Sequence, residues 1–248
     1  MQVKSFRVDR FISKHLNINR GDVRLMLAQE RIVINGQVVR DIATVVDEFD
    51  HVLLDGQTLQ NKEPVYIMLN KPVGVVSATK DDLHKTVMDL LPSHLLSDDL
   101  HIVGRLDLNT SGLLLLTNDS RWSRKLMSPE SKVAKVYRVT LEHELSEDYV
   151  SAFAAGMYFS FENITTQPAQ LTIIDKKVAE VILMEGKYHQ IKRMFGRFRN
   201  PVLALHRSAI GHLTLMGNLN LSSEAKNKRC LPEGESRLLT SAEVSGIF

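Results

Sequence analysis

The sequence predicts an α+β protein with a small N-terminal domain, followed by a larger domain built on a mixed, largely antiparallel sheet with flanking helices. Three observations lead to this prediction. Two helical patterns and a hairpin signal fill the first part of the chain, a polar stretch follows them, and strands then outnumber helices without regular alternation. A chain of 248 residues, 44% hydrophobic and 24% charged, is long enough to bury the cores of two such domains.

The N-terminal elements follow from apolar spacing and turn residues. The expected elements are helices at 6–16 and 20–29, a hairpin over 31–40, and one or two strands over 45–55. Asn17 and Asn19 separate the two helices, and Asn35-Gly36 between β-branched runs is a strong signal for a tight hairpin. The polar stretch 58–64 is the expected linker, which gives domains at 1–60 and 61–248.

The second domain contains short apolar runs bounded by Gly, Pro and Asn. The expected strands are 65–69, 112–117, 136–141, 170–174, 179–184, 203–205 and 213–215. The expected helices are 86–91, 122–127, 147–155, 188–198 and a short one at 241–244. Because these strands are numerous and do not alternate strictly with helices, a largely antiparallel or mixed sheet is expected.

The net charge of +2 hides two basic clusters. Residues 1–40 contain eight Lys or Arg against three acids, and residues 185–207 contain six against one. Such clusters indicate a surface for a polyanion, although solvated helix faces would give the same pattern. The single cysteine, Cys230, excludes an internal disulfide and a cysteine-rich zinc site. Neither a membrane-spanning apolar run nor a secretory signal is visible, so a cytoplasmic protein is expected.

The most unusual segment is 104–119, which reads GRLDLNTSGLLLLTND. Asp107 lies next but one to Arg105 in a turn-like stretch that leads into a buried strand, and loops held by a strand often contain catalytic groups. A nearby cation favours the charged carboxylate. A lone Asp in such a loop can equally cap a turn, and its spacing alone does not decide between the two roles.

Two further segments combine aromatic and basic residues. On a helix over 188–198, Lys192 and Arg193 would lie near Tyr188 and His189, a combination that can hold phosphates and stack on bases. The same helix could simply be amphipathic. The strand KVYRV, 135–139, would place Tyr137 either in packing or as a stacking platform.

Together these segments resemble the bacterial ribosomal RNA pseudouridine synthases. The segment 104–119 is similar to the signature of that family, and NKPVG (70–74), KVYRV (135–139) and EGKYHQIKRMF (185–195) match its other motifs in the expected order. The first 50 residues resemble an S4 RNA-binding domain, a module also found in a small-subunit ribosomal protein. YHQIKRMF (188–195) and LHRSAIG (205–211) look most like the members that act on 16S ribosomal RNA.

The resemblance implies roles for four catalytic residues. Asp107 matches the family's catalytic aspartate, which is essential for converting uridine to pseudouridine without a cofactor or metal. Tyr137 matches the aromatic residue that packs on the target base. Lys192 matches the basic partner of the aspartate, and Arg193 is the neighbouring alternative.

Further residues would contact the substrate. Arg105 would position the flipped nucleotide or its phosphate, and Leu205 would form the apolar back wall of the uracil pocket; simple structural support is the alternative for both. The residues expected to bind RNA from the first domain are Arg7, Arg10, Lys14, Arg20, Arg24 and Arg31.

The resemblance therefore implies a cytoplasmic, monomeric RNA pseudouridine synthase that isomerises one uridine of 16S ribosomal RNA. The alternatives are the same chemistry on 23S ribosomal RNA, or a non-catalytic RNA-binding assembly factor. Two departures from the family pattern are visible. Ser120 stands where a turn glycine is usual, and Glu30 stands where a glycine commonly precedes the hairpin, which puts RNA affinity rather than fold in doubt.

Overall fold

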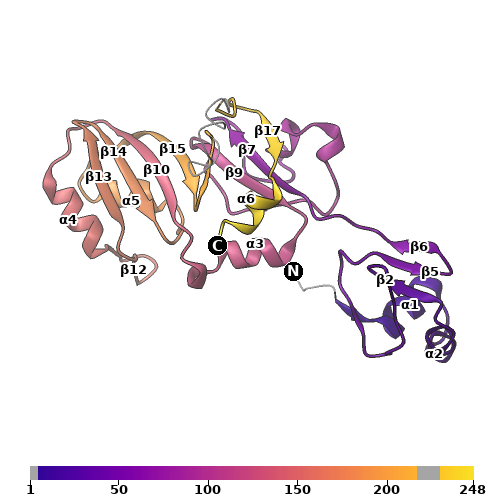
Figure 1. The fold of residues 1–248 in the computed structure, drawn as a ribbon. Helices are drawn as coiled ribbons and strands as arrows, with labels where there is room; N and C mark the ends of the chain where they lie inside the picture. Colours follow the sequence, from indigo (N-terminus) through magenta and orange to yellow (C-terminus); the bar gives the residue numbers. More distant parts are fainter. Residues whose placement is uncertain (1–4, 217–229) are drawn as a thin grey trace. The chain divides into compact units, whose positions relative to one another are not determined.

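The computed structural model describes residues 5–216 and 230–248, and the chain divides into two compact units, Met1–Val65 and Tyr66–Phe248 (Figure 1). The first unit contains β1 (Phe6–Arg7), α1 (Val8–Leu16), α2 (Arg20–Ala28), β2 (Ile32–Ile34), β3 (Gln37–Val38), β4 (Val45–Val46), β5 (Val52–Leu54) and β6 (Gln57–Gln60). Its strands form a four-stranded antiparallel sheet, β3-β2-β5-β6, and a separate β1-β4 pair.

The predicted helices and hairpin of the first unit are confirmed. Asn17 ends α1 in the left-handed conformation, and the side chain of Asn19 caps α2 by accepting the backbone N–H of Asp22 at 3.0 Å. Asn35 and Gly36 have φ of 51° and 81°, as a two-residue hairpin turn with two positive φ angles requires. Apolar residues of α1, α2 and the small sheet form a core of their own.

The predicted linker over 58–64 is wrong in its first part, because β6 pairs with β5. Gln60 donates its side-chain amide to the carbonyls of Asp47 and Asp50, at 2.7 and 2.8 Å, which fixes the stretch to the first unit. Most residues of β6 are polar, so no apolar pattern predicted a strand here. The strand forms through backbone pairing with β5 and through the side-chain amide of Gln60. The boundary between the two units in the chain therefore lies between Val65 and Tyr66.

The second unit is built on a nine-stranded mixed sheet in the order β13-β14-β10-β15-β9-β7-β17, with β16 beside β15 and β8 beside β9. Its strands are β7 (Tyr66–Lys71), β8 (His101–Val103), β9 (Ser111–Thr117), β10 (Lys135–Leu141), β13 (Gln170–Asp175), β14 (Val178–Leu183), β15 (Val202–Ile210), β16 (Leu213–Thr214) and β17 (Ser236–Leu238). A separate pair is formed by β11 (Tyr158–Phe159) and β12 (Ile164–Thr165). Every pairing in the large sheet is antiparallel except β15 with β9, so the predicted α+β class is confirmed.

The helices of this unit are α3 (Ser120–Met127), α4 (Glu147–Ala155), α5 (Gln190–Gly196) and α6 (Ser241–Ser245), with 3₁₀ turns at Met88–Leu90, Ser93–Leu95 and Pro129–Ser131. α4 and α5 flank the β13-β14-β10 half, while α3 and α6 lie beside the β9-β7-β17 half (Figure 1). Aromatic rings join α4 to the α5 region, with the Phe153 and Phe195 centroids 4.8 Å apart. Within the described residues, none of the helices is long and apolar enough to cross a lipid bilayer.

Three helix or strand predictions needed correction. The predicted helix over 86–91 is only the 3₁₀ turn Met88–Leu90, because Pro92 follows it and Asp89 instead accepts the backbone N–H of Thr86. The predicted helix over 188–198 begins two residues later, at Gln190. The predicted strand 203–205 is part of a nine-residue strand, β15.

The two departures from the family pattern have different consequences. Ser120 is the first residue of α3, where Asp119 caps the helix, so this position needs no glycine. Glu30 has φ of 59°, the left-handed region that glycine adopts without strain, and its carboxylate pairs with Arg40 at 2.8 Å. The Glu at this position therefore carries backbone strain while neutralising one arginine of the first basic cluster.

Candidate active site

The loop that carries Asp107 lies between β8 and β9 and is tied down on two sides. Ser77 accepts the backbone N–H of Leu106 and donates its hydroxyl to the carbonyl of the same residue, at 3.1 and 2.8 Å. The ammonium of Lys71, fully buried, donates to the carbonyl of Thr110 at 2.8 Å. The loop is thus held by the NKPVG segment and the residues after it, which places Asp107 at a defined point beside the sheet.

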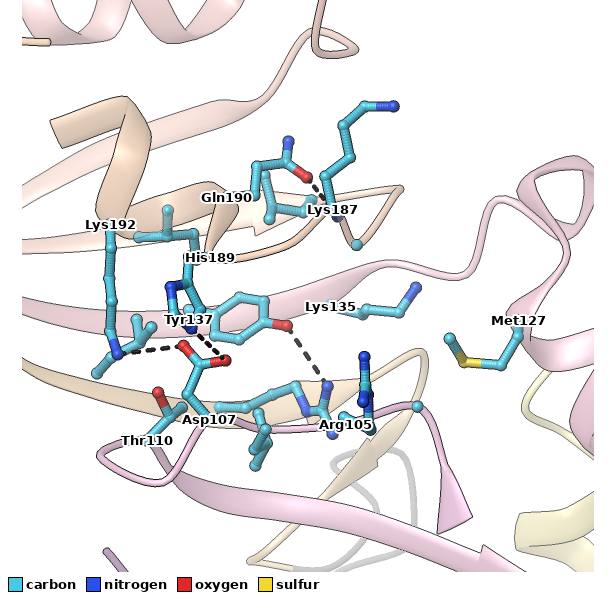
Figure 2. Close-up of a pocket in the computed structure, with 17 residues that line it drawn as sticks. Arg105, Asp107, Thr110, Met127, Lys135, Tyr137, Lys187, His189, Gln190 and Lys192 are labelled. Carbon is cyan, nitrogen blue, oxygen red and sulfur yellow. Dashed lines mark hydrogen bonds and ion pairs between the residues drawn. The ribbon is translucent and has the colours of Figure 1, made fainter. Parts of the chain in front are cut away.

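The carboxylate of Asp107 faces two side chains from the start of α5 (Figure 2). Its Oδ2 lies 3.1 Å from Nζ of Lys192, and its Oδ1 lies 3.4 Å from Nε2 of His189, which adds charge only when protonated. Asp107 and Lys192 are each 29% exposed, so the ion pair is partly shielded from water. The carboxylate therefore pairs with Lys192 of α5 and with His189, the residue just before this helix, rather than capping a turn.

The segment before α5 is fixed by buried polar contacts. Gln190 accepts the backbone N–H of Lys187 and donates its amide to Glu185, at 3.0 and 2.8 Å. His189 adopts a left-handed conformation with φ of 47°, which ends the irregular segment and turns its ring toward Asp107. This conformation is why the helix predicted over 188–198 starts at Gln190 and why Tyr188 lies outside it.

A pocket of about 110 Å³ opens beside this ion pair. An engineered cavity of about 150 Å³ holds a benzene ring, so a pocket of this size that opens at its mouth suits one pyrimidine ring. Five of the predicted site residues line it: Arg105, Asp107, Tyr137, Lys192 and Leu205. They come from the β8–β9 loop, β10, α5 and β15, which the sheet order brings together.

Individual residues of the pocket differ in exposure. Tyr137 and Leu205 are buried, whereas Arg105 is exposed at the rim. Among the described residues Arg105 forms no ion pair with Asp107, so its nearness in sequence does not make it the charge partner. The partner predicted as Lys192 or Arg193 is Lys192.

Arg193 points elsewhere and does not line the pocket. Its guanidinium binds the carboxylate of Glu162, with Nη1 2.6 Å from Oε1, and lies 3.8 Å from the ring centre of Phe159. The prediction that Arg193 serves as an alternative partner of Asp107 is therefore wrong, because its side chain is committed to an ion pair and an aromatic contact on another face of α5.

Spacing did not reveal several further pocket residues. Lys135, His189 and Arg207 line the pocket together with Thr110. The sequence grouped His189 with the basic residues of the helix over 188–198 but gave it no role, and nothing in the local pattern separates the other three from packing residues. Burial lowers the pKa of Lys71 to about 8, while the charge of Asp107 acts in the opposite direction. Among the residues that the structure describes, no group of three or more His, Cys, Asp or Glu could hold a metal ion.

The predicted RNA-binding residues of the first unit are mostly accessible. Arg7, Arg10, Lys14, Arg20 and Arg24 are exposed, and Arg7 and Arg24 line a shallow hollow beside α2. Two of the six are already paired. Arg7 contacts Asp9 at 3.2 Å, and the half-buried Arg31 binds both carboxylate oxygens of Asp55 at 2.8 and 2.6 Å.

Comparisons with known proteins identify the family of the chain. Residues 65–196 match the family model described as RNA pseudouridylate synthase, more than half of the chain and nearly every element around the pocket. The chain belongs to the RNA pseudouridylate synthase family, and it is therefore an isomerase that converts uridine to pseudouridine in RNA.

Full-length relatives refine the comparison. The chain is 50% identical over 242 residues to the ribosomal small subunit pseudouridine synthase A of Pseudomonas aeruginosa, covering 97% of this chain and 100% of that protein. It is 36% identical to the enzyme of the same name from Escherichia coli K12, covering 97% and 99%. A crystal structure of a pseudouridylate synthase, 34% identical, aligns over 98% of this chain and 100% of its own with a TM-score of 0.66.

Proposed function

We propose that this protein isomerises one uridine of 16S ribosomal RNA, with Asp107 as the catalytic carboxylate. The observation that carries the proposal is the ion pair between Asp107 and Lys192 at the edge of a pocket that Tyr137 also lines. The relatives that match over their full length are named as small-subunit enzymes, which supports 16S ribosomal RNA as the substrate.

Asp107 acts on the sugar side of the reaction. Breaking the N1–C1′ bond leaves positive character at C1′, and a charged carboxylate stabilises it by attack or by electrostatics. Lys192 and His189 contact the two oxygens of the carboxylate and hold them in fixed positions. After cleavage the detached uracil turns, and its C5 forms the new bond to C1′.

Tyr137 and Leu205 act on the base. A uridine taken out of an RNA helix loses its stacking, at a cost of about a few kcal/mol, and needs a replacement surface. The buried ring of Tyr137 offers that surface, and Leu205 forms the apolar wall behind it. Arg105, exposed at the rim, would hold the nucleotide or its phosphate.

The first unit, Met1–Val65, would bind structured RNA as an S4 domain, and the second unit, Tyr66–Phe248, would be the catalytic domain that the sequence predicted from residue 61 onward. Its exposed arginines and lysine contact phosphates, which makes RNA binding dependent on salt. The protein acts as a cytoplasmic monomer in this proposal, and it uses neither a metal nor a cofactor because the carboxylate supplies the catalytic charge.

Pseudouridine mapping tests the function and the RNA target together. Ribosomal RNA from a strain lacking the protein is treated with carbodiimide and read by reverse transcription, after complementation with wild type, Asp107→Asn or Asp82→Asn. Asp82 is an exposed carboxylate outside the pocket and is the matched control. We expect one 16S signal to disappear in the deletion strain and to return with wild type and Asp82→Asn, but not with Asp107→Asn.

Other outcomes separate chemistry from target. Loss of a 23S signal instead would keep the chemistry and refute the 16S substrate. Unchanged signals in both RNAs, together with no tritium release from 16S RNA labelled at uridine C5, would leave a non-catalytic RNA-binding protein. Full activity of Asp107→Asn would refute its catalytic role.

A further inference from the structure

Two buried cations lie in the wall of the pocket. Lys135 is 7% exposed and Arg207 is 3% exposed, and they stand on neighbouring strands, β10 and β15. Tyr137 pairs directly with Arg207 in this ladder, so the base-stacking ring and the guanidinium are fixed relative to each other. Neither cation has a part in the chemistry described above.

The hydrogen bonds of the two cations leave their charge uncompensated. Arg207 donates Nε to the carbonyl of Leu113 at 2.8 Å and Nη1 to the hydroxyl of Tyr137 at 3.4 Å. Its buried Nη2 has no hydrogen-bond partner among residues 5–216 and 230–248. The ammonium of Lys135 donates to the carbonyl of Val133 at 3.3 Å. Within the described part of the chain, neither cation forms an ion pair with an acidic side chain.

In this pocket the more buried cations lack acidic partners among the described side chains, which is the opposite of what is usual in proteins. Buried charges are normally paired, because desolvation costs several kcal/mol per ion. Nearby cations that are more accessible do have acidic partners: Lys187 pairs with Glu185, and Lys192 with Asp107. Burial lowers the pKa of Lys135, and the charge of Arg207 lowers it further, so each cation raises the cost of the other.

We propose that Lys135 and Arg207 bind the uracil ring while it carries negative charge during the reaction. The inference rests on the proposed function of the pocket. When the N1–C1′ bond breaks, its electron pair goes to the ring and is shared by N1, O2 and O4. If the carboxylate of Asp107 adds to C6 instead, the ring again becomes an anion, with charge on O4.

The negative charge is temporary, and the atoms balance. The new bond uses an electron pair from C5, which attacks C1′, and the C5 proton then leaves while N1 gains a proton. Cations that act in a low-dielectric pocket stabilise such a charge more strongly than cations in water. Because the charge is absent from neutral uridine, the two cations favour the intermediate over the bound substrate.

The layout of the pocket fits separate roles for Asp107 at the sugar and for the two buried cations at the base. Figure 2 shows Asp107, His189 and Lys192 gathered on one side of Tyr137, with the hydroxyl of Tyr137 pointing away from Asp107 toward the side where Lys135 lies. A ring that stacks on Tyr137 would thus have the carboxylate near the sugar and the cations near its carbonyl oxygens.

Binding of free pyrimidines to the full-length protein without RNA tests the inference. The probes are uracil, which is neutral at pH 7, and barbiturate, a pyrimidine ionised at that pH, both followed by ligand-observed NMR titration. We expect barbiturate to bind roughly 10-fold more tightly than uracil, which corresponds to about 1.4 kcal/mol. The preference should disappear in Lys135→Gln and Arg207→Gln and persist in Lys176→Gln, which removes an exposed lysine.

The outcomes separate this inference from the proposed function. Equal binding of the two probes by wild type, or binding of neither, would overturn the role of the cations even if the enzyme is active. That comparison needs no variant, so unfolding of Arg207→Gln cannot obscure it. We also expect Lys135→Gln to slow single-turnover tritium release about 100-fold with RNA affinity unchanged, by analogy with loss of one oxyanion-binding group. An unchanged rate would overturn the inference.

Discussion

Replacing Gly112 with alanine should destabilise the second unit, because this glycine of β9 lies directly against the backbone of Arg207 in β15. Its φ is 110°, and a Cβ would lie 2.2 Å from the carbonyl oxygen and 2.7 Å from the amide nitrogen of Arg207. Since ordinary contacts begin near 3.4 Å, the two backbones would have to separate by about 1 Å. No flexible side chain is available to absorb this shift, because both contacting atoms belong to the backbone of β15.

The expected magnitude follows from two costs. An alanine with this positive φ costs about 1–2 kcal/mol, and weakening the β9–β15 ladder and its packing adds roughly another 1–2 kcal/mol. The free energy of unfolding should therefore fall by about 3 kcal/mol. For a unit of this size, about 2–4 °C is lost per kcal/mol, so the melting temperature should fall by roughly 6–12 °C.

Calorimetry and urea unfolding measure the change, with Gly234→Ala as the matched control. Gly234 also has a positive φ, 83°, but a Cβ there meets nothing within 4 Å. The control should therefore lose only the conformational part, about 1 kcal/mol. If Gly112→Ala melts within 2 °C of the control, the collision deduced from the structure is wrong.

Three further predictions concern charge. Lys192→Met should slow tritium release about 100-fold, because Asp107 loses its ion-pair partner. Arg193→Met should leave the rate within about twofold but lower the melting temperature, because Arg193 pairs with Glu162 instead. Equal slowing by both variants would contradict the assignment of Lys192 as the partner of Asp107. Arg20→Glu combined with Arg24→Glu should weaken RNA binding at least 10-fold and flatten the dependence of log affinity on log salt by about two units, which filter binding measures. Burial lowers the pKa of Lys71 to about 8 from 10.5, so the unfolded chain binds more protons between pH 8 and 10 and stability should rise with pH in that window, by up to about 1.4 kcal/mol per unit. Urea unfolding should show this rise in wild type but not in Lys71→Met, and a flat wild-type profile would refute it.

Sequence patterns predicted the elements whose signals are local. The helix over 147–155 was placed at its observed ends, and the hairpin at Asn35-Gly36 has the conformation that those residues favour. Strand β17 was missed because a three-residue strand has too short a pattern, and it forms only by pairing with β7. Strand β15 was underestimated because three successive polar residues, His206, Arg207 and Ser208, interrupt its apolar residues.

The site was predicted through motifs rather than through spacing. Asp107 and Lys192 are far apart in the chain, and only the resemblance to a family indicated that they meet. Even then the sequence kept Arg193 as an alternative to Lys192, since neighbouring helix positions differ only in the face they present. His189 was not predicted as a site residue, because its orientation depends on a left-handed backbone that no local pattern signalled.

The position of β15 in the sheet also sets the order in which the protein can become functional during its synthesis. This strand lies between β10 and β9, so the half of the sheet with Tyr137 and the half that holds Asp107 lack a shared neighbour until residues 202–210 have been made. Within the part of the chain that the structure describes, the first unit has its own core and its strands pair only with one another. The growing chain can therefore complete its proposed RNA-binding unit long before it can complete a catalytic pocket.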